Sequence, residues 1–416
     1  MATPSRYLTE ERLRIRAEAR EFAAAEVLPL ANELDRQKAD IPRWFLDRMA
    51  ERGYFGITIP RELGGLGLGV FEYCLITEEL ARAWMSVASI IARGNGMGTQ
   101  VQDPERRREL LRRSARGEWV GAAALSEPSA GSDLANVSCR AVRDGDAWVI
   151  HGEKRWCGNA RAADFIQLLA RVRDPEPGEP RSTGLATFVV EKERDRFPEG
   201  LRGQPIDKVG YHGMTTWHLW FEGLRVPEAN RVAAPRTLPR GPGAERGAFQ
   251  ATQAGLNVAR VHTAARAVGL ARGALEDCIA YSQERVQFER PIAGFQAVRF
   301  KIADMAAEVE AARALVHQVA QAMDDGLPSE KEAAMVKLFA TEMAVRVTGD
   351  GIQLHGGNGY TTERAVERYW RDARLTTIFE GTSEIQRRTI SDRLLGRPPG
   401  SPPANPSANP SEGAQD

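Results

Sequence analysis

Residues 148–158 read WVIHGEKRWCG, a stretch in which aromatic and β-branched residues alternate with polar ones. Such alternation is typical of antiparallel strands with one buried face. Short runs of the same kind are AWVIHG at 147–152, DFIQLLARV at 164–172, GLATFVVEK at 184–192 and TTWHLWFEGLRVP at 215–227. Because no long helical pattern separates them, we expect a central antiparallel β-domain over 119–236 rather than a doubly wound parallel sheet.

N-terminal to this region, the apolar residues take helical spacing. They recur three to five positions apart at Leu13, Ala17, Phe22, Val27 and Leu30, after a plausible helix start at Thr9. A second helix is predicted from Pro42 to Gly53. The glycine-rich segment from Gly53 to Gly69 lacks the strand and spacing of a dinucleotide-binding fingerprint and is predicted to connect helices. Residues 1–118 are therefore predicted to form an all-α N-terminal domain.

Helical spacing returns after a polar connection around residues 238–247. One long stripe, closed by Gly326 and Pro328, consists of Val298, Ile302, Met305, Val309, Ala312, Val316, Val319 and Met323. We expect a C-terminal four-helix bundle over 237–396, and a disordered tail over 397–416, which is rich in Pro, Ser, Gly and Asn. The predicted fold class is α+β multidomain.

Composition excludes several classes of protein. The 416 residues exceed one small binding module, and 56 basic residues balance 56 acidic ones, so no overall field favours nucleic acid or an anionic membrane. The four cysteines form no CxxC pair and the six histidines no HExxH motif, so no metal site and no disulfide framework are predicted. No signal peptide and no membrane-spanning segment are recognised, and a cytoplasmic location is expected.

Two glycine-rich or polar segments interrupt the predicted β-domain. In LSEPSAGSD, residues 125–133, small residues would let backbone N–H groups approach a ligand, although a loop capped by Ser and Asp explains the same residues. In GEKRWCGNA, residues 152–160, the Trp156 indole could lie against a planar cofactor or could fill the core of the β-domain.

A third segment, RDARLTTIFEGTSEIQ at 371–386, places Glu380 after an apolar run. Apolar surroundings disfavour the charged form of a carboxylate, which suits it to act as a general base on a weakly acidic C–H. Alternatively, Glu380 caps the next helix, because EGTSE also has the pattern of a helix start.

Taken in order, these segments resemble the acyl-CoA dehydrogenase family from about Leu8 to Leu395. The resemblance is carried by PRELGGLG at 60–67, LSEPSAGSD, GEKRW, Val226-Pro227, ERVQFERP at 284–291 with FQA at 295–297, QLHGGNGY at 353–360, and RDAR at 371–374 with FEGTSEIQ at 379–386. It implies an FAD enzyme that dehydrogenates an acyl-CoA thioester to the trans-2-enoyl-CoA in fatty acid β-oxidation. It also implies a homotetramer and an electron-transferring flavoprotein as electron acceptor.

The resemblance also implies roles for single residues. Glu380 matches the base that takes the α-proton while flavin N5 takes the β-hydride; some members carry the base just before the arginine that matches Arg260, but here that position is Ala259. Arg260 is expected to order the active-site loop. The expected FAD contacts are Leu125, Ser126, Gly131, Ser132, Trp156 and Gly158, with Arg285, Phe288, Gln353 and Gly357 across a subunit interface and Thr382 and Glu384 nearby.

Two positions depart from the family pattern. Gly158 stands where members commonly carry a hydroxyl residue that donates to the flavin near N5, so the redox potential or the oxygen reactivity could differ. Arg93 ends an apolar run that aligns with the base of the acyl pocket, and Asn257 is a second candidate substrate contact. A buried Arg93 would need an anion such as an acidic acyl group; the simpler interpretation is that it points outward at a helix C-terminus.

Two other function classes fit parts of the sequence. A flavin-dependent acyl-CoA oxidase, or another elimination on a CoA thioester, would use the same residues. A non-catalytic nucleic-acid-binding relative should carry a basic extension, whereas the tail after Leu395 has hardly any charge.

Overall fold

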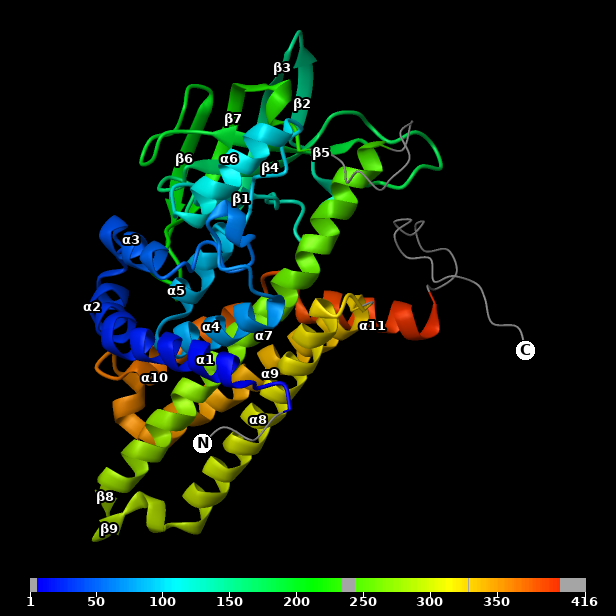
Figure 1. Cartoon of the computed structure of the whole chain (residues 1–416). Helices are drawn as coiled ribbons and strands as arrows, with labels where there is room; N and C mark the ends of the chain where they lie inside the picture. The colour runs from blue at the N-terminus through cyan, green and yellow to red at the C-terminus, as the bar shows by residue number, and fades with distance from the viewer. Residues whose placement is uncertain (1–5, 233–243, 328, 397–416) are drawn as a thin grey trace.

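The computed structural model describes residues 6–232, 244–327 and 329–396, and it consists of a helical N-terminal part, a β-sheet part and a long helical bundle (Figure 1). This arrangement confirms the predicted fold class. The predicted tail at 397–416 and much of the predicted connection around 238–247 lie outside the described residues. Within the described ranges, no helix is both long and apolar enough to cross a bilayer.

The N-terminal part contains the two predicted helical regions. Thr9 caps the first helix, as predicted, because its hydroxyl accepts a hydrogen bond from the backbone N–H of Arg12. The helices are α1 (Glu10–Phe22), α2 (Leu28–Gln37), α3 (Arg43–Glu51), α4 (Val70–Ala83), α5 (Met85–Ile90) and α6 (Pro104–Ala115), and a π-helical turn, Ala23–Val27, joins α1 to α2.

The β-sheet part is one seven-stranded sheet with the order β1-β4-β2-β3-β7-β6, and β5 pairs with β4. Its strands are β1 (Gly121–Ala124), β2 (Arg140–Asp144), β3 (Ala147–Gly158), β4 (Phe165–Arg171), β5 (Leu185–Glu191), β6 (Leu201–Ile206) and β7 (Thr216–Pro227). The four predicted runs correspond to β3, β4, β5 and β7. The pairing is antiparallel except where β4 meets β1 and β2.

Sequence patterning missed β1, β2 and β6 for identifiable reasons. The strand β1 is GAAA, which lacks β-branched residues, and β6 is an edge strand that contains Gly203 and Pro205. Three of the five residues of β2, RAVRD, are charged. Pairing with neighbouring strands, rather than intrinsic preference, sets these three strands.

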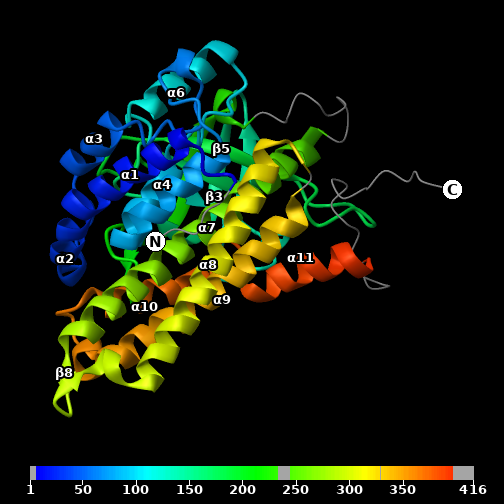
Figure 2. The same cartoon turned by 60° about the horizontal axis from the view of Figure 1, so that its bottom comes forward.

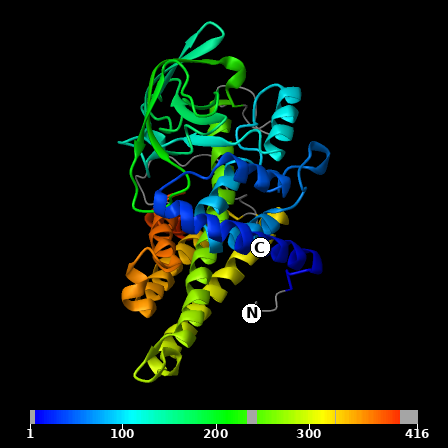
Figure 3. The same cartoon turned by 90° about the vertical axis from the view of Figure 1, so that its left-hand side faces the viewer.

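The C-terminal part consists of α7 (Ala244–Glu284), α8 (Gln296–Asp324), α9 (Glu330–His355), α10 (Ala365–Thr376) and α11 (Ser383–Leu395). The helices α7, α8, α9 and α10 pack on one another as the predicted bundle, and α11 packs on α9. Figure 2 shows α8 and α9 side by side, with α11 beside α9 and extending to the right. The 41 residues of α7 span roughly 60 Å and connect the sheet to the small hairpin of β8 (Val286–Gln287) and β9 (Arg290–Pro291), as Figure 3 shows.

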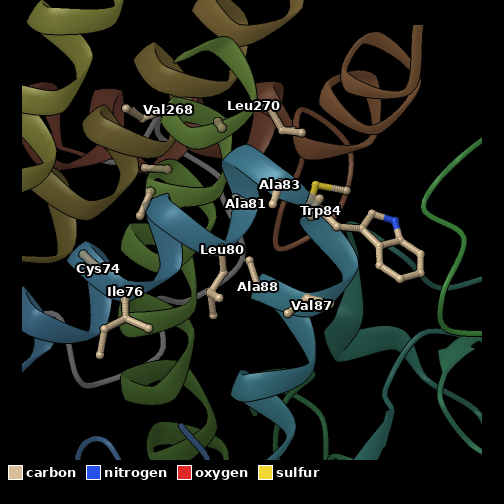
Figure 4. Close-up of a cluster of buried hydrophobic side chains, with 14 of the residues drawn as sticks. Cys74, Ile76, Leu80, Ala81, Ala83, Trp84, Val87, Ala88, Val268 and Leu270 are labelled. Carbon is tan, nitrogen blue, oxygen red and sulfur yellow. The ribbon is translucent and has the colours of Figure 1, made fainter. Parts of the chain in front are cut away.

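Close packing of α4 and α5 against α7 joins the N-terminal part to the bundle. A Cβ atom on Gly269 of α7 would lie 2.4 Å from the backbone oxygen of Glu78, so only glycine permits this approach. Figure 4 shows Leu80 and Ala81 of α4 in this cluster beside Val268 and Leu270 of α7. Burial of these side chains contributes about 25 cal/mol per Å² of apolar area removed from water.

A buried ionic cluster lies across the same contact. Arg272 of α7 reaches Glu78 at 3.1 Å and Glu79 at 2.7 Å, and Arg313 of α8 reaches Glu78 at 3.0 Å. Although burial alone would raise the pKa of Glu78, the charges of Arg313 and Arg272 outweigh it and lower that pKa to about 2. Ion pairs between buried side chains thus link α4, α7 and α8.

We expect Arg272→Met to lower the free energy of unfolding by about 3–5 kcal/mol, because it leaves two buried carboxylates short of a cation. The lowered pKa of Glu78 makes its contribution complete above the unfolded value of about 4.3 and lost as the pH falls towards about 2. Urea titrations at neutral and acidic pH measure both effects. Arg14→Met, whose partner Glu18 is 3.9 Å away on an exposed surface, is the control and should change stability by less than about 1 kcal/mol. An equal effect of both substitutions would contradict the prediction.

Candidate active site

A buried ion pair brings the first two predicted segments together. The Lys154 ammonium donates to the Glu127 carboxylate and to the backbone oxygen of Leu125, each at 2.8 Å, and both charged side chains are at most 1% exposed. Burial alone would raise the pKa of Glu127, but the Lys154 charge and donors from Ser138 and Cys139 lower it. The loop that begins at Leu125 is therefore fixed against β3.

The backbone of β3 then turns Trp156 outward. The register with β7 shifts between Lys154 and Cys157, and Trp156 at this bulge has a φ of 68° and an indole that is 58% exposed. The backbone N–H of Arg155 donates to the oxygen of Ser126 at 2.9 Å, which places Ser126 next to this turn. The alternative that Trp156 fills the β core is wrong.

This surface suits a planar cofactor. An exposed indole held in a strained backbone conformation offers a flat apolar face, and the adjoining Ser126 offers a hydroxyl. At Gly131 a Cβ would meet nothing within 4 Å, and Ser132 is exposed beside it, so the rim of the surface is open.

The third segment forms a loop that presents Glu380 between α10 and α11. The backbone oxygen of Gly381 accepts from the Lys337 ammonium at 2.7 Å and from the Gln386 amide at 2.8 Å. Thr382 caps α11 by accepting from the N–H of Ile385 at 3.4 Å, so the alternative in which Glu380 is the cap is wrong. Glu380 has a φ of 53°, and no hydrogen bond engages its carboxylate within the part of the chain that the structure describes.

The groups around Glu380 are cationic, which corrects the expectation of purely apolar neighbours. Burial lowers the pKa of Arg260 and of Arg266, and it lowers that of Lys337 to about 8; in each case the Glu380 charge opposes the shift. The apolar run before Glu380 was only part of its surroundings, because α7 and α9 supply charges from elsewhere in the sequence. Phe379 remains apolar, with its ring 5.9 Å from that of Tyr211.

The structure places the predicted substrate contacts near this loop. The Arg260 guanidinium donates to the amide oxygen of Asn257 at 2.9 Å, on α7. Arg93 ends the 3-10 turn Ile91–Arg93, and its guanidinium nitrogen lies 3.5 Å from the position of a Cβ on Gly158. The simpler interpretation, in which Arg93 points outward, is therefore wrong.

A second group of predicted residues lies at the far end of the bundle. Phe288 forms the turn between β8 and β9, is 87% exposed and has a φ of 50°. Arg285 directly follows α7, one turn beyond Tyr281, whose hydroxyl accepts from Asn358 at 2.9 Å next to Gly357. Gln353, on the last turn of α9, is exposed at the same end.

Within one chain, the residues near Trp156 and Glu380 lie far from the residues near Arg285. Arg260 and Arg285 are separated by about seven turns of α7, which is roughly 37 Å. Thr382 and Glu384, at the start of α11, lie with the Glu380 loop rather than with Arg285.

Sequence reasoning missed several residues that shape the site. They are Glu127, Lys154, Arg266, Lys337 and Gln386. The signal for Arg266 was an arginine within the small, apolar run VHTAARAVGLARG, and the signal for Lys337 was a lysine in the similarly apolar AAMVKLFA. The partners that tie them to other elements, Ser89 for Arg266 and Gly381 for Lys337, are more than 40 positions away in the chain, so spacing alone could not connect them.

Comparison with known proteins identifies the family. The chain matches the models of the acyl-CoA dehydrogenase N-terminal domain at residues 9–118, the middle domain at 122–224 and the C-terminal domain at 245–395. The chain belongs to the acyl-CoA dehydrogenase family, whose members are FAD-dependent oxidoreductases.

Three relatives illustrate the range of CoA thioesters for which similar proteins are named. Cyclohex-1-ene-1-carbonyl-CoA dehydrogenase of Geobacter metallireducens is 40% identical over 94% of this chain and 99% of its own. The structure of butyryl-CoA dehydrogenase from Megasphaera elsdenii is 30% identical, with a TM-score of 0.84 over 95% of this chain and 100% of that one. A glutaryl-CoA dehydrogenase from Mycobacterium smegmatis, solved with FADH2, is 25% identical, with a TM-score of 0.84 over 94% and 96% of the two chains.

Replacing Lys337 by Met should lower kcat by roughly 10- to 100-fold, because the loop that carries Glu380 loses a buried donor. The wild-type pH profile should contain a step near pH 8, where Lys337 loses its proton, and the variant should lack that step. Lys331→Met, on the same helix but with a partly exposed side chain, is the control. A Lys337→Met enzyme with an unchanged pH profile would show that the lysine does not act on the Glu380 loop.

Proposed function

We propose that this enzyme removes hydrogen from Cα and Cβ of an acyl-CoA thioester, with Glu380 as the base. The observation that carries the proposal is the Glu380 loop: its backbone is fastened through Gly381, while its carboxylate stays free of hydrogen bonds to the described residues. A carboxylate held in this way can accept a proton without first breaking an internal contact. The thioester carbonyl makes the α-proton acidic enough for that transfer.

The chain's own residues divide the remaining tasks. FAD, when bound, supplies the acceptor for the hydride that leaves Cβ. Leu125, Ser126 and Trp156 would hold its ring system on the surface fixed by Lys154, with Gly131, Ser132 and Gly158 at the edges. Arg260 would position the Glu380 loop through its charge.

The group at the far end of the bundle is proposed to hold the adenylate half of an FAD whose ring lies on another subunit. Arg285 supplies a cation suited to a pyrophosphate, and Phe288 an exposed ring. Gln353 and Gly357 adjoin them, and Thr382 and Glu384 would approach the cofactor from α11. The homotetramer implied by the family resemblance would supply this partner.

The protein that accepts electrons from the reduced enzyme and the metabolic pathway are also proposals. An electron-transferring flavoprotein is the proposed acceptor, with fatty acid β-oxidation in the cytoplasm as the setting. The relatives act on different thioesters, so the acyl group needs separate evidence. A flavin-dependent oxidase stays as a second candidate because Gly158 lacks the hydroxyl that members of the family commonly carry; oxygen consumption without the electron-transfer partner would identify it.

Glu380→Gln should retain flavin and acyl-CoA binding but lower turnover by roughly 100- to 10,000-fold, because an amide cannot accept the α-proton. Bleaching of the flavin on addition of acyl-CoA measures the reaction, and spectral shifts measure binding. Glu363→Gln, at an exposed position, is the control. Unimpaired turnover in Glu380→Gln would assign the base elsewhere, and a colourless wild-type protein that binds no FAD would contradict the proposed function.

A shared FAD site can be tested by complementation between subunits. Trp156→Ala and Arg285→Glu should each lower the flavin content, and mixed oligomers of the two chains should recover part of it, because one interface then combines an intact Trp156 with an intact Arg285. Flavin per chain after co-expression is the measurement. Trp44→Ala, which removes a 59% exposed tryptophan from α3, should leave the flavin content unchanged. No recovery in mixed oligomers would place both halves of the site in one chain.

A further inference from the structure

Two arginines from different parts of the fold converge beside the Glu380 loop. Arg93 comes from the turn after α5, and Arg266 comes from the middle of α7. The Arg266 guanidinium lies 4.7 Å from the ring centre of Phe379, the residue before Glu380. The Arg93 charge acts on Arg266 and on the buried Tyr73, so the two cations share one region.

Neither cation has a counter-ion among the described residues. Arg266 is 4% exposed, and its two terminal nitrogens donate only to neutral hydroxyls, those of Ser89 at 2.7 Å and Thr263 at 2.6 Å. Its Nε has no partner at all. Arg93 makes no hydrogen bond or ion pair with any residue in the described ranges. The equally buried Arg272, by contrast, is paired with two carboxylates.

The surrounding charges do not supply the missing anion. Arg260 and Lys337 add two more cations, on which the charges of Glu330 and Glu342 also act. Glu380 is the carboxylate whose charge acts on Arg266, and among the described residues it lies beyond ion-pairing distance of all four cations. Burying an unpaired cation is costly, so a buried guanidinium such as Arg266 calls for an anionic ligand.

Gly158 borders Arg93. A Cβ at this position would lie 3.5 Å from the guanidinium nitrogen, which is an ordinary van der Waals contact, so this backbone position faces the arginine. The two departures from the family pattern, Gly158 and Arg93, therefore lie next to each other in the structure.

We propose that Arg93 and Arg266 bind a carboxylate carried by the acyl group, which makes dicarboxylyl-CoA thioesters the substrate class. This inference rests on the proposed function, since it concerns the acyl pocket of the same reaction. Guanidinium groups bind carboxylates through paired, charge-assisted hydrogen bonds, and two of them would fix the acyl chain beside the base. The proposed reaction would be unchanged: Glu380 would take the α-proton, FAD when bound would supply the acceptor for the β-hydride, and the second carboxylate would be retained.

The test compares thioesters that differ only in this charge. The holoenzyme is assayed with succinyl-CoA against isocaproyl-CoA and with glutaryl-CoA against isoheptanoyl-CoA, since in each pair two methyl groups replace the two carboxylate oxygens. Both members carry the same CoA, so a difference cannot come from the CoA phosphates. We expect kcat/KM to favour a dicarboxylyl member by about 30-fold or more.

Variants then assign that preference to the arginines. Arg93→Met and Arg266→Gln should each reduce it by about 30-fold, mainly through KM, while turnover of the monocarboxylic member persists. Arg93→Lys should keep part of it, and Arg107→Met, on the exposed face of α6, should keep all of it. If Arg266→Gln fails to fold, the Arg93 variants alone decide.

The outcomes separate this inference from the proposed function. A wild-type enzyme that dehydrogenates monocarboxylic and dicarboxylic thioesters equally, or an Arg93→Met variant with an unaltered preference, overturns the carboxylate site and leaves the dehydrogenase intact. A flavin that no thioester bleaches overturns the proposed function itself.

Discussion

The close contact between α4 and α7 is the constraint on which the site depends. It exists because Gly269 has no side chain at the point where a Cβ would meet the backbone of Glu78 at 2.4 Å. The same approach stacks Tyr73 on His262 with ring centres 4.5 Å apart and sets Glu79 against Arg272. A residue larger than glycine at position 269 would separate α4 from α7.

The fold was largely predictable from the sequence, because it depends on patterns that are local. Alternation identified β3, β4, β5 and β7, and the helical stripe from Val298 to Met323 identified α8. The strands that were missed, β1, β2 and β6, owe their conformation to neighbours in the sheet and not to their own residues. Local preference therefore predicted the architecture, while these three strands depend on pairing within the folded sheet.

The site was predictable only in part, for a related reason. Trp156 and Glu380 stand out in sequence because their segments have unusual composition, and both occupy left-handed backbone conformations that bulky residues rarely adopt. Lys337 and Arg266 carry no such mark, since each looks like a single charge on an otherwise apolar helix. Lys337 and Arg266 were not recognised because their contacts, with Gly381 and Ser89 respectively, form only when the chain folds.

Two groups of buried charges in this protein differ in whether each cation has a carboxylate partner. Where α4, α7 and α8 meet, Arg272 and Arg313 are matched by Glu78 and Glu79, so the cluster is complete and serves to join helices. Around Glu380 the charges of Glu330 and Glu342 act on Arg260 and Lys337, but no carboxylate of the described residues forms an ion pair with Arg266 or Arg93. Arg272 lies only about two turns from Arg266 on α7 and is paired with two carboxylates. The lack of a carboxylate partner at Arg266 is therefore not a general property of the buried arginines of this helix. The unpaired cations agree with the carboxylate site proposed above, in which the missing anion would arrive with the ligand.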